Sequence, residues 1–207
     1  MLKRTTKKFV ENYLSQKKDW KILDIGCGYT ANKYSNHVAD TQDFSDLYKD
    51  KKFTLIKDKK LPFADKEFNF VIASHVLEHI EDVGFFIKEL ERVANSGYIE
   101  VPTRLEDNLV DVNEKAHIWW INFDDINHSL FITKRKQIVE PFLSVSTAQN
   151  LRKFFRDSFV TEVLWDSKID YLISDNNSQF EFYKKLSFLE IIKKFFSKKI
   201  RRLFKFI

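Results

Sequence analysis

Residues 20–28 read WKILDIGCG, a compact apolar run that ends in two glycines separated by one residue. A short apolar run that stops at a turn signal is typical of a strand buried on both faces, as in a parallel sheet. Glycine in such a turn permits positive φ and lets a ligand approach the backbone. A helix following the turn would present its N-terminus to a carboxylate or another anion. Taken alone, the same pattern also fits a tight turn without a ligand.

Further strands and helices are expected on both sides of this stretch. Residues 5–18 predict a short polar helix, and residues 80–94 predict a helix because their apolar side chains recur at helical spacing. Strands are expected at residues 37–41, 53–57, 68–74 and 98–101. Strands that alternate with helices predict a doubly wound α/β domain with a mostly parallel sheet and right-handed crossovers.

The second half of the chain is expected to complete this sheet. Residues 117–133 are rich in tryptophan, phenylalanine and isoleucine around an Asp-Asp-Ile-Asn break, which predicts a hairpin or a strand-loop-strand insertion. Residues 144–155 predict a helix with Ser146 as a candidate N-cap. Residues 159–165 and 170–173 then predict antiparallel final strands.

Composition and charge narrow the class of protein. The chain has 207 residues, 43% of them hydrophobic, which suffices for one full core. The only cysteine is Cys27, so no internal disulfide can form and a reducing, cytoplasmic compartment is expected. No apolar stretch has the length of a signal peptide or a transmembrane span. Residues 22–183 carry 19 basic against 27 acidic side chains, which argues against a nucleic-acid footprint on the body of the chain.

Several linked motifs together resemble the class I S-adenosylmethionine-dependent methyltransferase family. In chain order they are LDIGCG at 23–28, LPF at 61–63, FNFVI at 68–72, HVLEH at 75–79 and ELERV at 89–93. The resemblance spans about residues 20–103 and implies a Rossmann-like fold with S-adenosylmethionine as cofactor. The expected domains are a methyltransferase domain over residues 1–183 and a basic amphipathic C-terminal helix over residues 184–207.

The resemblance also implies which residues meet the cofactor. Gly26 and Gly28 would line its methionine part, and Asp24 would orient the loop. Asp40, or as second choice Asp43, would accept both ribose hydroxyls, since two carboxylate oxygens can pair with two vicinal hydroxyls. Asp58 would meet the adenine amino group, with Leu61 and Phe63 along the adenine face. The full set of expected cofactor contacts is Asp24, Gly26, Cys27, Gly28, Asp40, Asp58, Leu61, Ser74 and His75.

Two positions depart from the family pattern. Thr30 stands where the family has a third loop glycine, and Asn69-Phe70 stands where Phe-Asp is usual. The first departure could narrow the loop, and the second removes a common carboxylate. A relative that keeps the fold without turnover, as a binding module or membrane-tethered scaffold, is therefore the alternative function.

The HVLEH segment is open to several interpretations. Its spacing matches inverted zinc-protease signatures, but a hydrolase is disfavoured because the segment starts at the end of a strand. The resemblance favours a bracing role for Glu78 and His79 beside the cofactor, with no metal. The alternative is a divalent ion, for which His75, Glu78, His79 and His117 are the candidate ligands. Without an ion, His79 or His117 is the candidate catalytic base, since imidazole titrates near neutrality.

The sequence defines the methyl acceptor less closely than the cofactor site. An oxygen on a small molecule, a saccharide or a lipid-linked glycan precursor is the expected methyl acceptor, and no nucleic acid is expected as partner. The candidate acceptor wall is Thr103, Arg104, Trp119, Trp120 and Phe123, although the aromatic residues could equally be core.

Residues 184–207 hold nine basic residues and one acid between apolar residues at three- and four-residue steps. This pattern predicts a basic amphipathic helix on an anionic membrane or a partner, or else one packed on the domain.

Overall fold

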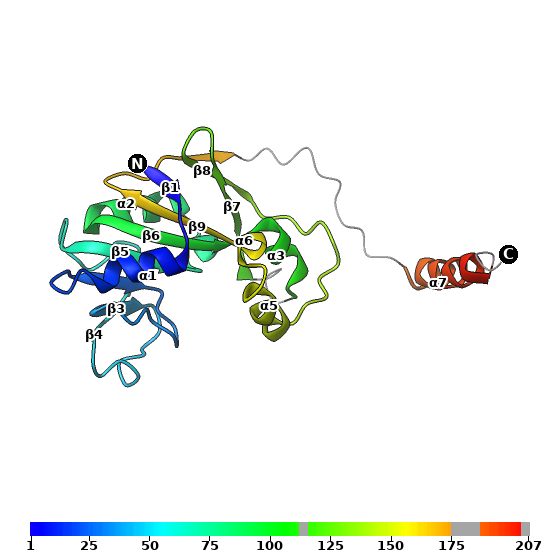
Figure 1. Ribbon diagram of the computed structural model, residues 1–207, viewed down its shortest axis with the longest axis horizontal. Coiled ribbons are helices and arrows are strands. Elements are labelled where there is room, and N and C mark those ends of the chain that lie inside the picture. Colours follow the sequence, from blue (N-terminus) through cyan, green and yellow to red (C-terminus); the bar gives the residue numbers. More distant parts are fainter. Residues whose placement is uncertain (112–115, 175–186, 204–207) are drawn as a thin grey trace.

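The seven-stranded sheet at the centre of the protein has the order β1-β9-β6-β5-β2-β3-β4 (Figure 1). This computed structural model describes residues 1–111, 116–174 and 187–203, with side chains as far as residue 197. Five neighbouring strands run parallel: β6 (Ala94–Pro102), β5 (Phe68–Ser74), β2 (Ile22–Ile25), β3 (His37–Asp40) and β4 (Lys52–Leu55). β9 (Val160–Asp166) pairs antiparallel with β6, so the expected fold class is confirmed.

The first strand was not expected from the sequence. β1 (Leu2–Arg4) pairs antiparallel with β9 and forms the edge of the sheet. Leu2 is buried there opposite Trp165. A three-residue strand whose partner lies at the other end of the chain leaves no local periodicity, because its burial is decided by tertiary pairing.

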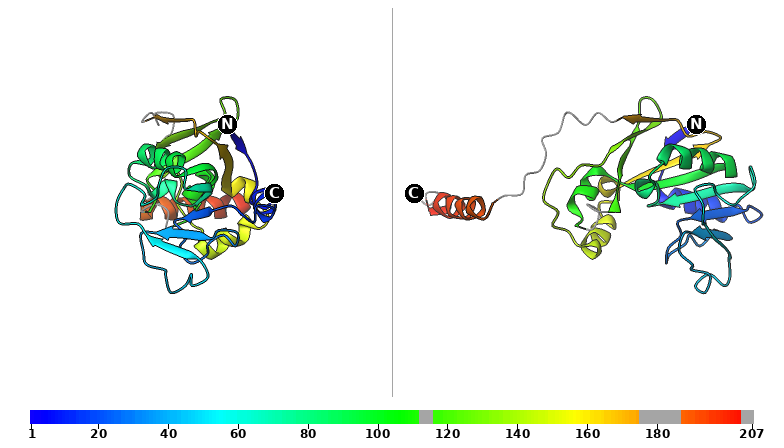
Figure 2. Two further views of the ribbon diagram at one scale, coloured as in Figure 1. Left: turned by 90° about the vertical axis from the view of Figure 1, so that its left-hand side faces the viewer. Right: turned by 180° about the vertical axis from the view of Figure 1, so that it is seen from behind.

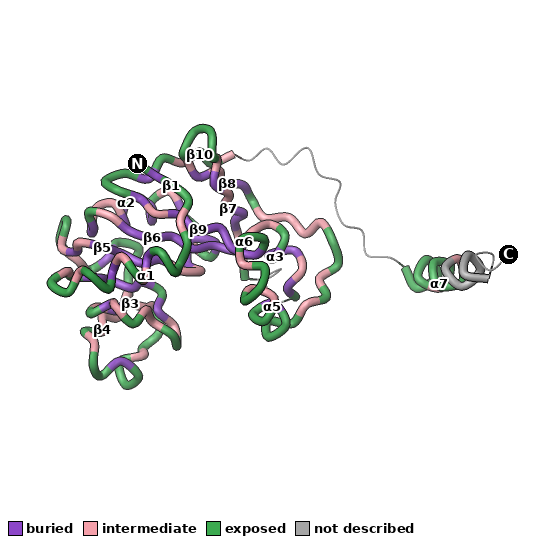
Figure 3. The backbone as a smooth tube through the Cα atoms, in the orientation of Figure 1, coloured by how far each residue is buried: buried purple, intermediate pink, exposed green. Residues whose placement is uncertain are grey.

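Different elements cover the two faces of the sheet (Figure 2). On one face, α1 (Lys7–Ser15) buries Val10 and Leu14 against Phe70 and Ile72 of β5. On the other face, α2 (Val83–Val93) buries its apolar stripe in the largest core cluster. That cluster also holds side chains of β7 (Trp119–Asp124) and β8 (Ser129–Lys134). Figure 3 shows the buried positions concentrated in the central strands.

The connections between β2, β3, β4 and β5 contain no helix, so the expected alternation of strand and helix fails on this side of the sheet. Residues 26–36, 41–51 and 56–67 form turns and bends instead. The apolar side chains of the segment 41–51 are Phe44, Leu47 and Tyr48, which span a single helical turn. The segment therefore lacks the longer apolar stripe by which a helix packs. Apart from Leu61, which joins the largest core cluster, these loops contribute Cys27 and Tyr48 to a small buried cluster with Val38 of β3.

A second sheet has the order β10-β8-β7. The expected hairpin at 117–133 is confirmed by the antiparallel pairing of β7 and β8. The expectation for residues 170–173 was wrong, because β10 (Tyr171–Ser174) pairs parallel with β8 and does not join the main sheet. Its alternation is that of a strand, but pattern alone cannot name the partner strand.

Short helices complete the body of the protein. They are η1 (Leu77–His79), α3 (Arg104–Leu109), α5 (Val145–Arg152) and α6 (Arg156–Phe159). The expected helix at 144–155 is present as α5, but Ser144 and not Ser146 is its N-cap, since the Ser144 hydroxyl accepts from the Thr147 amide at 3.3 Å. Ser146 is already inside the first turn.

The last helix, α7 (Phe188–Leu203), lies apart from the α/β body (Figure 1). It confirms that the tail is helical, and Phe188 and Leu189 are 75% and 76% exposed. The expected domain boundary between residues 183 and 184 lies outside the described residues. Among the described helices, none combines the length and the apolar character that crossing a membrane requires.

Gly97 provides a test of the packing at the sheet centre. A Cβ at this position would lie 2.5 Å from the carbonyl oxygen of Val71 and 2.7 Å from Nε1 of Trp165. Gly97→Ala should therefore lower the free energy of unfolding by about 1–3 kcal/mol, measured by chemical denaturation followed by circular dichroism. Gly84→Ala is the matched control, because its nearest neighbour, the Tyr171 hydroxyl, lies at 3.2 Å and alanine favours the helix. Equal losses in the two variants would contradict this account.

Candidate functional site

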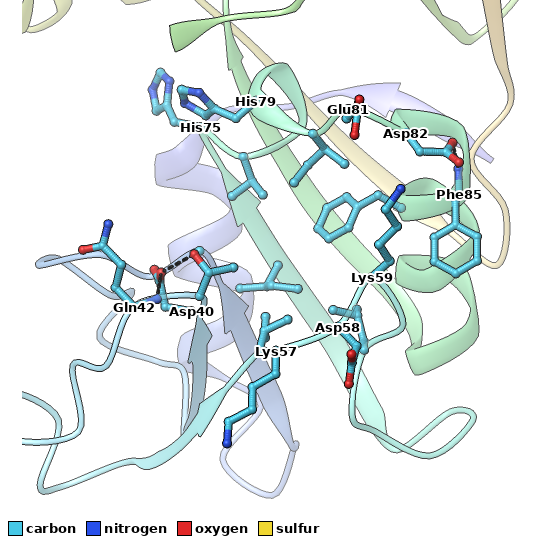
Figure 4. A pocket seen from close by; sticks show the side chains of 18 residues that line it. Asp40, Gln42, Lys57, Asp58, Lys59, His75, His79, Glu81, Asp82 and Phe85 are labelled. Carbon is cyan, nitrogen blue, oxygen red and sulfur yellow. Dashed lines mark hydrogen bonds between the residues drawn. The ribbon is translucent and has the colours of Figure 1, made fainter.

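A cleft of about 640 Å³ lies at the carboxyl ends of β2, β3, β4 and β5 (Figure 4). The strand order runs outward in opposite directions from the β2–β5 pair, and ligands of open parallel sheets bind at such a reversal point. The volume falls within the range of small-molecule sites, roughly 300–1,000 Å³. The lining side chains include four carboxylates, Asp40, Asp58, Glu81 and Asp82, and two lysines, Lys57 and Lys59.

The glycine turn after β2 forms one wall of the cleft. Gly26 has φ of 67° and donates its amide to the carbonyl of Ala39 at 2.8 Å. A Cβ at Gly26 would lie 2.5 Å from Cγ2 of Val76, so this wall requires glycine. The expected helix after the turn is absent, because residues 29–36 form turns and bends. The turn therefore offers its own backbone, and not a helix N-terminus, to a ligand.

Asp40 ends β3 and points into the cleft. Its Oδ2 accepts from the amide of Gly28 at 2.9 Å, and its Oδ1 accepts from the amide of Gln42 at 3.0 Å. Asp40 therefore holds the second glycine of the turn in place while it lines the cleft. Asp43, the second choice for the ribose contact, is exposed in a turn and does not line the cleft.

Asp24 lies beneath the glycine turn and does not line the cleft. Its carboxylate is 5% exposed and accepts from the amide of Asn32 at 2.6 Å, which fixes the loop that follows the turn. Burial raises the pKa of Asp24 to about 7. The geometry agrees with a role in orienting the loop.

The LPF and ELERV segments meet behind the cleft. The amide of Leu61 donates to Oε2 of Glu89 at 2.7 Å, and Arg92 donates to the carbonyls of Leu61 and Phe63 at 3.0 and 2.7 Å. These hydrogen bonds fix the position of Leu61, which lines the cleft together with Asp58. Phe63 packs edge-on against Phe68 and does not border the cleft.

Three other expected cofactor contacts lie outside the lining. Cys27 is buried beside Val38 and Tyr48, and burial raises the pKa of its thiol to about 12. The Gly28 amide is held by Asp40. Ser74 donates its hydroxyl to Glu100 at 3.2 Å, away from the cleft. Of the nine expected contacts, Gly26, Asp40, Asp58, Leu61 and His75 line the cleft.

His75 stands at one end of the cleft, next to His79 (Figure 4). Its Nδ1 lies 3.2 Å from Oε1 of Glu78, and its Nε2 lies 3.3 Å from Oε1 of Glu100. Burial lowers the pKa of His75, but hydrogen bonds and attraction to Glu100 and Glu78 outweigh burial and raise the pKa to about 9. His75 therefore links two buried carboxylates.

His79 and His117 lie side by side although they are far apart in the sequence, which a shared divalent ion would require. Their ring centroids are 4.6 Å apart. Nδ1 of His79 lies 2.8 Å from the carbonyl of Ala116, and Nδ1 of His117 is hydrogen-bonded to Asp107. Both rings therefore turn Nε2 away from these acceptors.

The candidate acceptor wall does not border the cleft. Trp119 and Trp120 are buried and donate their indole N–H groups to the carbonyl of Ile80 and to Asp107 at 2.8 and 2.7 Å. Phe123 belongs to the core, Thr103 caps α3, and Arg104 lies over the ring of Trp120. These side chains belong to the structure that surrounds the cleft, and they do not contact its interior.

Sequence reasoning missed a buried network of charged side chains next to His75. Glu100 and Glu162 face each other across β6 and β9, and Arg156 pairs with both. The Tyr98 hydroxyl oxygen lies 2.5 Å from a carboxylate oxygen of Glu100 and 2.6 Å from one of Glu162. The available signal was a charged residue inside each of two otherwise apolar strands, which buried positions rarely hold unless paired.

A family model and a relative of known sequence each match part of this chain. The family described as "Methyltransferase domain" matches residues 23–99. An uncharacterized protein of Methanocaldococcus jannaschii is 33% identical over 107 residues, which cover 45% of each chain. The match thus spans less than half of that protein's length.

Among solved structures, a Pyrococcus horikoshii protein aligns over 78% of this chain and 89% of its own, with 18% identity and a TM-score of 0.44. An S-adenosylmethionine-dependent methyltransferase from Aquifex aeolicus aligns over 76% and 87%, with 13% identity and a TM-score of 0.41.

The buried carboxyl of Asp24 predicts a distinctive pH dependence of stability. Its pKa rises from 3.8 to about 7 on folding, so the folded state binds more protons than the unfolded state between these values. The contribution of Asp24 to the free energy of unfolding should therefore fall as pH rises from about 4 to 7, by up to about 4 kcal/mol. Asp24→Asn keeps an acceptor for the Asn32 amide and removes this fall.

Urea denaturation of wild type and Asp24→Asn at several pH values measures the difference. The variant should gain stability over wild type as pH rises through this window, and the gain should level off above pH 7. A difference that does not change with pH would mean that Asp24 is ionised throughout.

Proposed function

Because residues 23–99 match the family described as "Methyltransferase domain", we propose that this protein transfers a methyl group from S-adenosylmethionine to an oxygen atom of a small-molecule or saccharide acceptor. The cofactor of this family is S-adenosylmethionine, which supplies an already activated methyl group. The chain must then bind it, align the acceptor oxygen and exclude water. The cleft at the carboxyl ends of four parallel strands is the observation that carries the proposal.

The cofactor occupies the part of the cleft between the glycine turn and β4. Gly26 allows the methionine portion to approach the backbone, Asp40 accepts from the ribose hydroxyls, and Asp58 accepts from the adenine amino group. The charge of the lining supports this assignment, because four carboxylates against two lysines favour a sulfonium ion. Asn69 lies at the start of β5, where its Oδ1 accepts from the Lys21 amide, so its departure from the family pattern does not touch the cleft.

The acceptor binds at the end of the cleft where His75 and His79 stand. A hydroxyl acceptor must lose its proton during transfer, and imidazole nitrogens near it assist that loss. Nε2 of His79 is directed away from its own hydrogen-bond acceptor and His79 lines the cleft, so this side chain can assist the loss of the proton, either directly or by holding an ion. This histidine supports oxygen as the methyl acceptor.

We further propose that α7 lies on an anionic membrane surface. Phe188, Leu189 and Phe195 are largely exposed, and Lys193 and Lys194 share the helix with them. An amphipathic helix with apolar and basic side chains binds the interface of anionic bilayers. A saccharide carried on a lipid would then be brought to the cleft by the same surface.

The cofactor assignment predicts different outcomes for two neighbouring aspartates. Asp40→Ala removes a carboxylate of the cleft and should weaken S-adenosylmethionine binding at least tenfold in titration calorimetry. Asp43→Ala removes an exposed carboxylate outside the cleft and should leave binding unchanged. If Asp43→Ala alone loses affinity, the ribose contact is misplaced.

The same titration tests the proposed activity. No binding of S-adenosylmethionine or S-adenosylhomocysteine by the wild-type chain would exclude methyl transfer. Binding without consumption of the donor in the presence of a broad set of hydroxyl acceptors would instead favour the non-catalytic binding module.

The membrane proposal is tested with vesicles. The full chain should sediment with phosphatidylcholine vesicles containing 30% phosphatidylserine, should not sediment with pure phosphatidylcholine, and should be released by salt. Lys193→Ala with Lys194→Ala should reduce partitioning roughly thirtyfold, since each basic residue near the surface contributes about 1 kcal/mol. Lys49→Ala with Lys52→Ala, two exposed lysines of the body, is the control. Equal sedimentation with both vesicle types would refute an electrostatic membrane site.

A further inference from the structure

We propose that Glu78, His79 and His117 bind a divalent transition-metal ion, and that this ion holds the methyl acceptor through its oxygen atoms. The second part rests on the proposed function. The metal site itself rests only on the three side chains and their surroundings.

The three side chains are close enough to share one ion. Oxygen or nitrogen atoms of Glu78, His79 and His117 all lie within 4.8 Å of one another. Ligand atoms at about 2.0–2.2 Å from an ion lie at most about 4.4 Å apart. Because His79 is exposed, a small rotation of its ring closes the difference.

Glu78 has a buried oxygen that lacks a partner among the described residues. The residue is 1% exposed, and its Oε1 is taken by His75. Its Oε2 is buried and makes no hydrogen bond. A buried carboxylate oxygen without a partner is costly, whereas a cation bound to it would remove that cost.

Both imidazoles are held in the orientation that metal binding requires. Nδ1 of His117 is hydrogen-bonded to a carboxylate oxygen of Asp107, and Nδ1 of His79 lies 2.8 Å from the carbonyl of Ala116. Each Nδ1 therefore carries the proton, and each Nε2 presents a lone pair. Metal-binding histidines are oriented in this way by an acceptor on the other ring nitrogen.

The acceptor that orients His117 is itself fixed. The other Asp107 oxygen accepts from Nε1 of Trp120 at 2.7 Å and pairs with Arg135 at 2.5 Å. Asp107 is 1% exposed. Such rigid support is what a binding site needs to hold its ligands in position.

His75, the fourth candidate ligand, is excluded. Its two ring nitrogens are both engaged, one by Glu78 and the other by Glu100. Three protein ligands remain, which leaves coordination positions open for another molecule, as catalytic sites do. Two imidazoles with one carboxylate favour transition-metal ions over magnesium or calcium.

The open positions adjoin the acceptor end of the cleft, because His79 lines it. An ion there lowers the pKa of a bound hydroxyl. The hydroxyl releases its proton to solvent, and its oxygen forms a bond to the methyl carbon. The bond from that carbon to sulfur breaks, and its electron pair stays on the sulfur, which becomes a neutral thioether. Because more than one coordination position is open, the substrate class that fits the site best is an acceptor whose hydroxyl and an adjacent oxygen atom both bind the ion.

Cobalt(II) is a suitable probe, because its visible absorption reports coordination by nitrogen and oxygen. The full chain, stripped with a chelator, should bind one Co²⁺ in calorimetric and absorption titrations, and bind Mg²⁺ far more weakly. His79→Ala and Glu78→Gln should each weaken Co²⁺ binding at least tenfold. His128→Asn, which removes a histidine outside the cluster, should bind Co²⁺ as the wild type does.

Each variant is also titrated with S-adenosylmethionine, so that the two proposals can fail separately. If the wild type binds S-adenosylmethionine but not Co²⁺, the metal site is overturned and methyl transfer still stands. The same holds if His79→Ala binds Co²⁺ as tightly as the wild type does. Co²⁺ binding that the variants lose, in a chain that does not bind the donor, would support the metal site and remove the proposed function. If Glu78→Gln does not fold, exposed His79→Ala decides alone.

Discussion

The parallel pairing of β2 with β5 is the constraint on which the site depends. Its register sets Ile25 beside Ala73, so the two strands end together at one edge of the sheet. The chain leaves them in opposite directions, towards β3 and towards β6, and the turns that follow separate into two walls. Gly26 on one wall approaches Val76 on the other so closely that a side chain would not fit. The cleft exists because these walls diverge just beyond that contact.

Local patterns sufficed for the elements whose burial is decided within one segment. The strand expected at residues 68–74 has the same bounds in the structure, because a continuous apolar run buried on both faces is its own signature. Elements whose place depends on a distant partner were not predictable. Leu2 is buried only because it faces Trp165, and β10 pairs with β8 through a register that its own residues do not encode. The helix expected after Gly28 is absent. A family resemblance does not predict a helix where the residues lack the apolar stripe by which it would pack.

The candidate site divides in the same way. Gly26, which a motif carries, and Asp40, which was expected at the end of the second strand, both reach the cleft because parallel strands end there. Asp107 gave no sequence signal, since an acid within a short polar helix resembles a solvated one. Its role became visible only when α3 was placed beside His117. That contact shifts the interpretation of HVLEH from helix bracing, which the motif favours, towards ion binding.

The half of the sheet that holds the proposed cofactor residues is thinly covered. β4 has no fully buried residue, and the cluster beside it consists of only three buried side chains, Cys27, Val38 and Tyr48. Segments with so few buried apolar contacts open at lower free energy than the rest of a domain. A ligand that joins Gly26, Asp40 and Asp58 would tie three separate loops together where the protein is weakest. Supply of that ligand in the cell would thus govern how long the chain resists proteolysis, independently of catalysis.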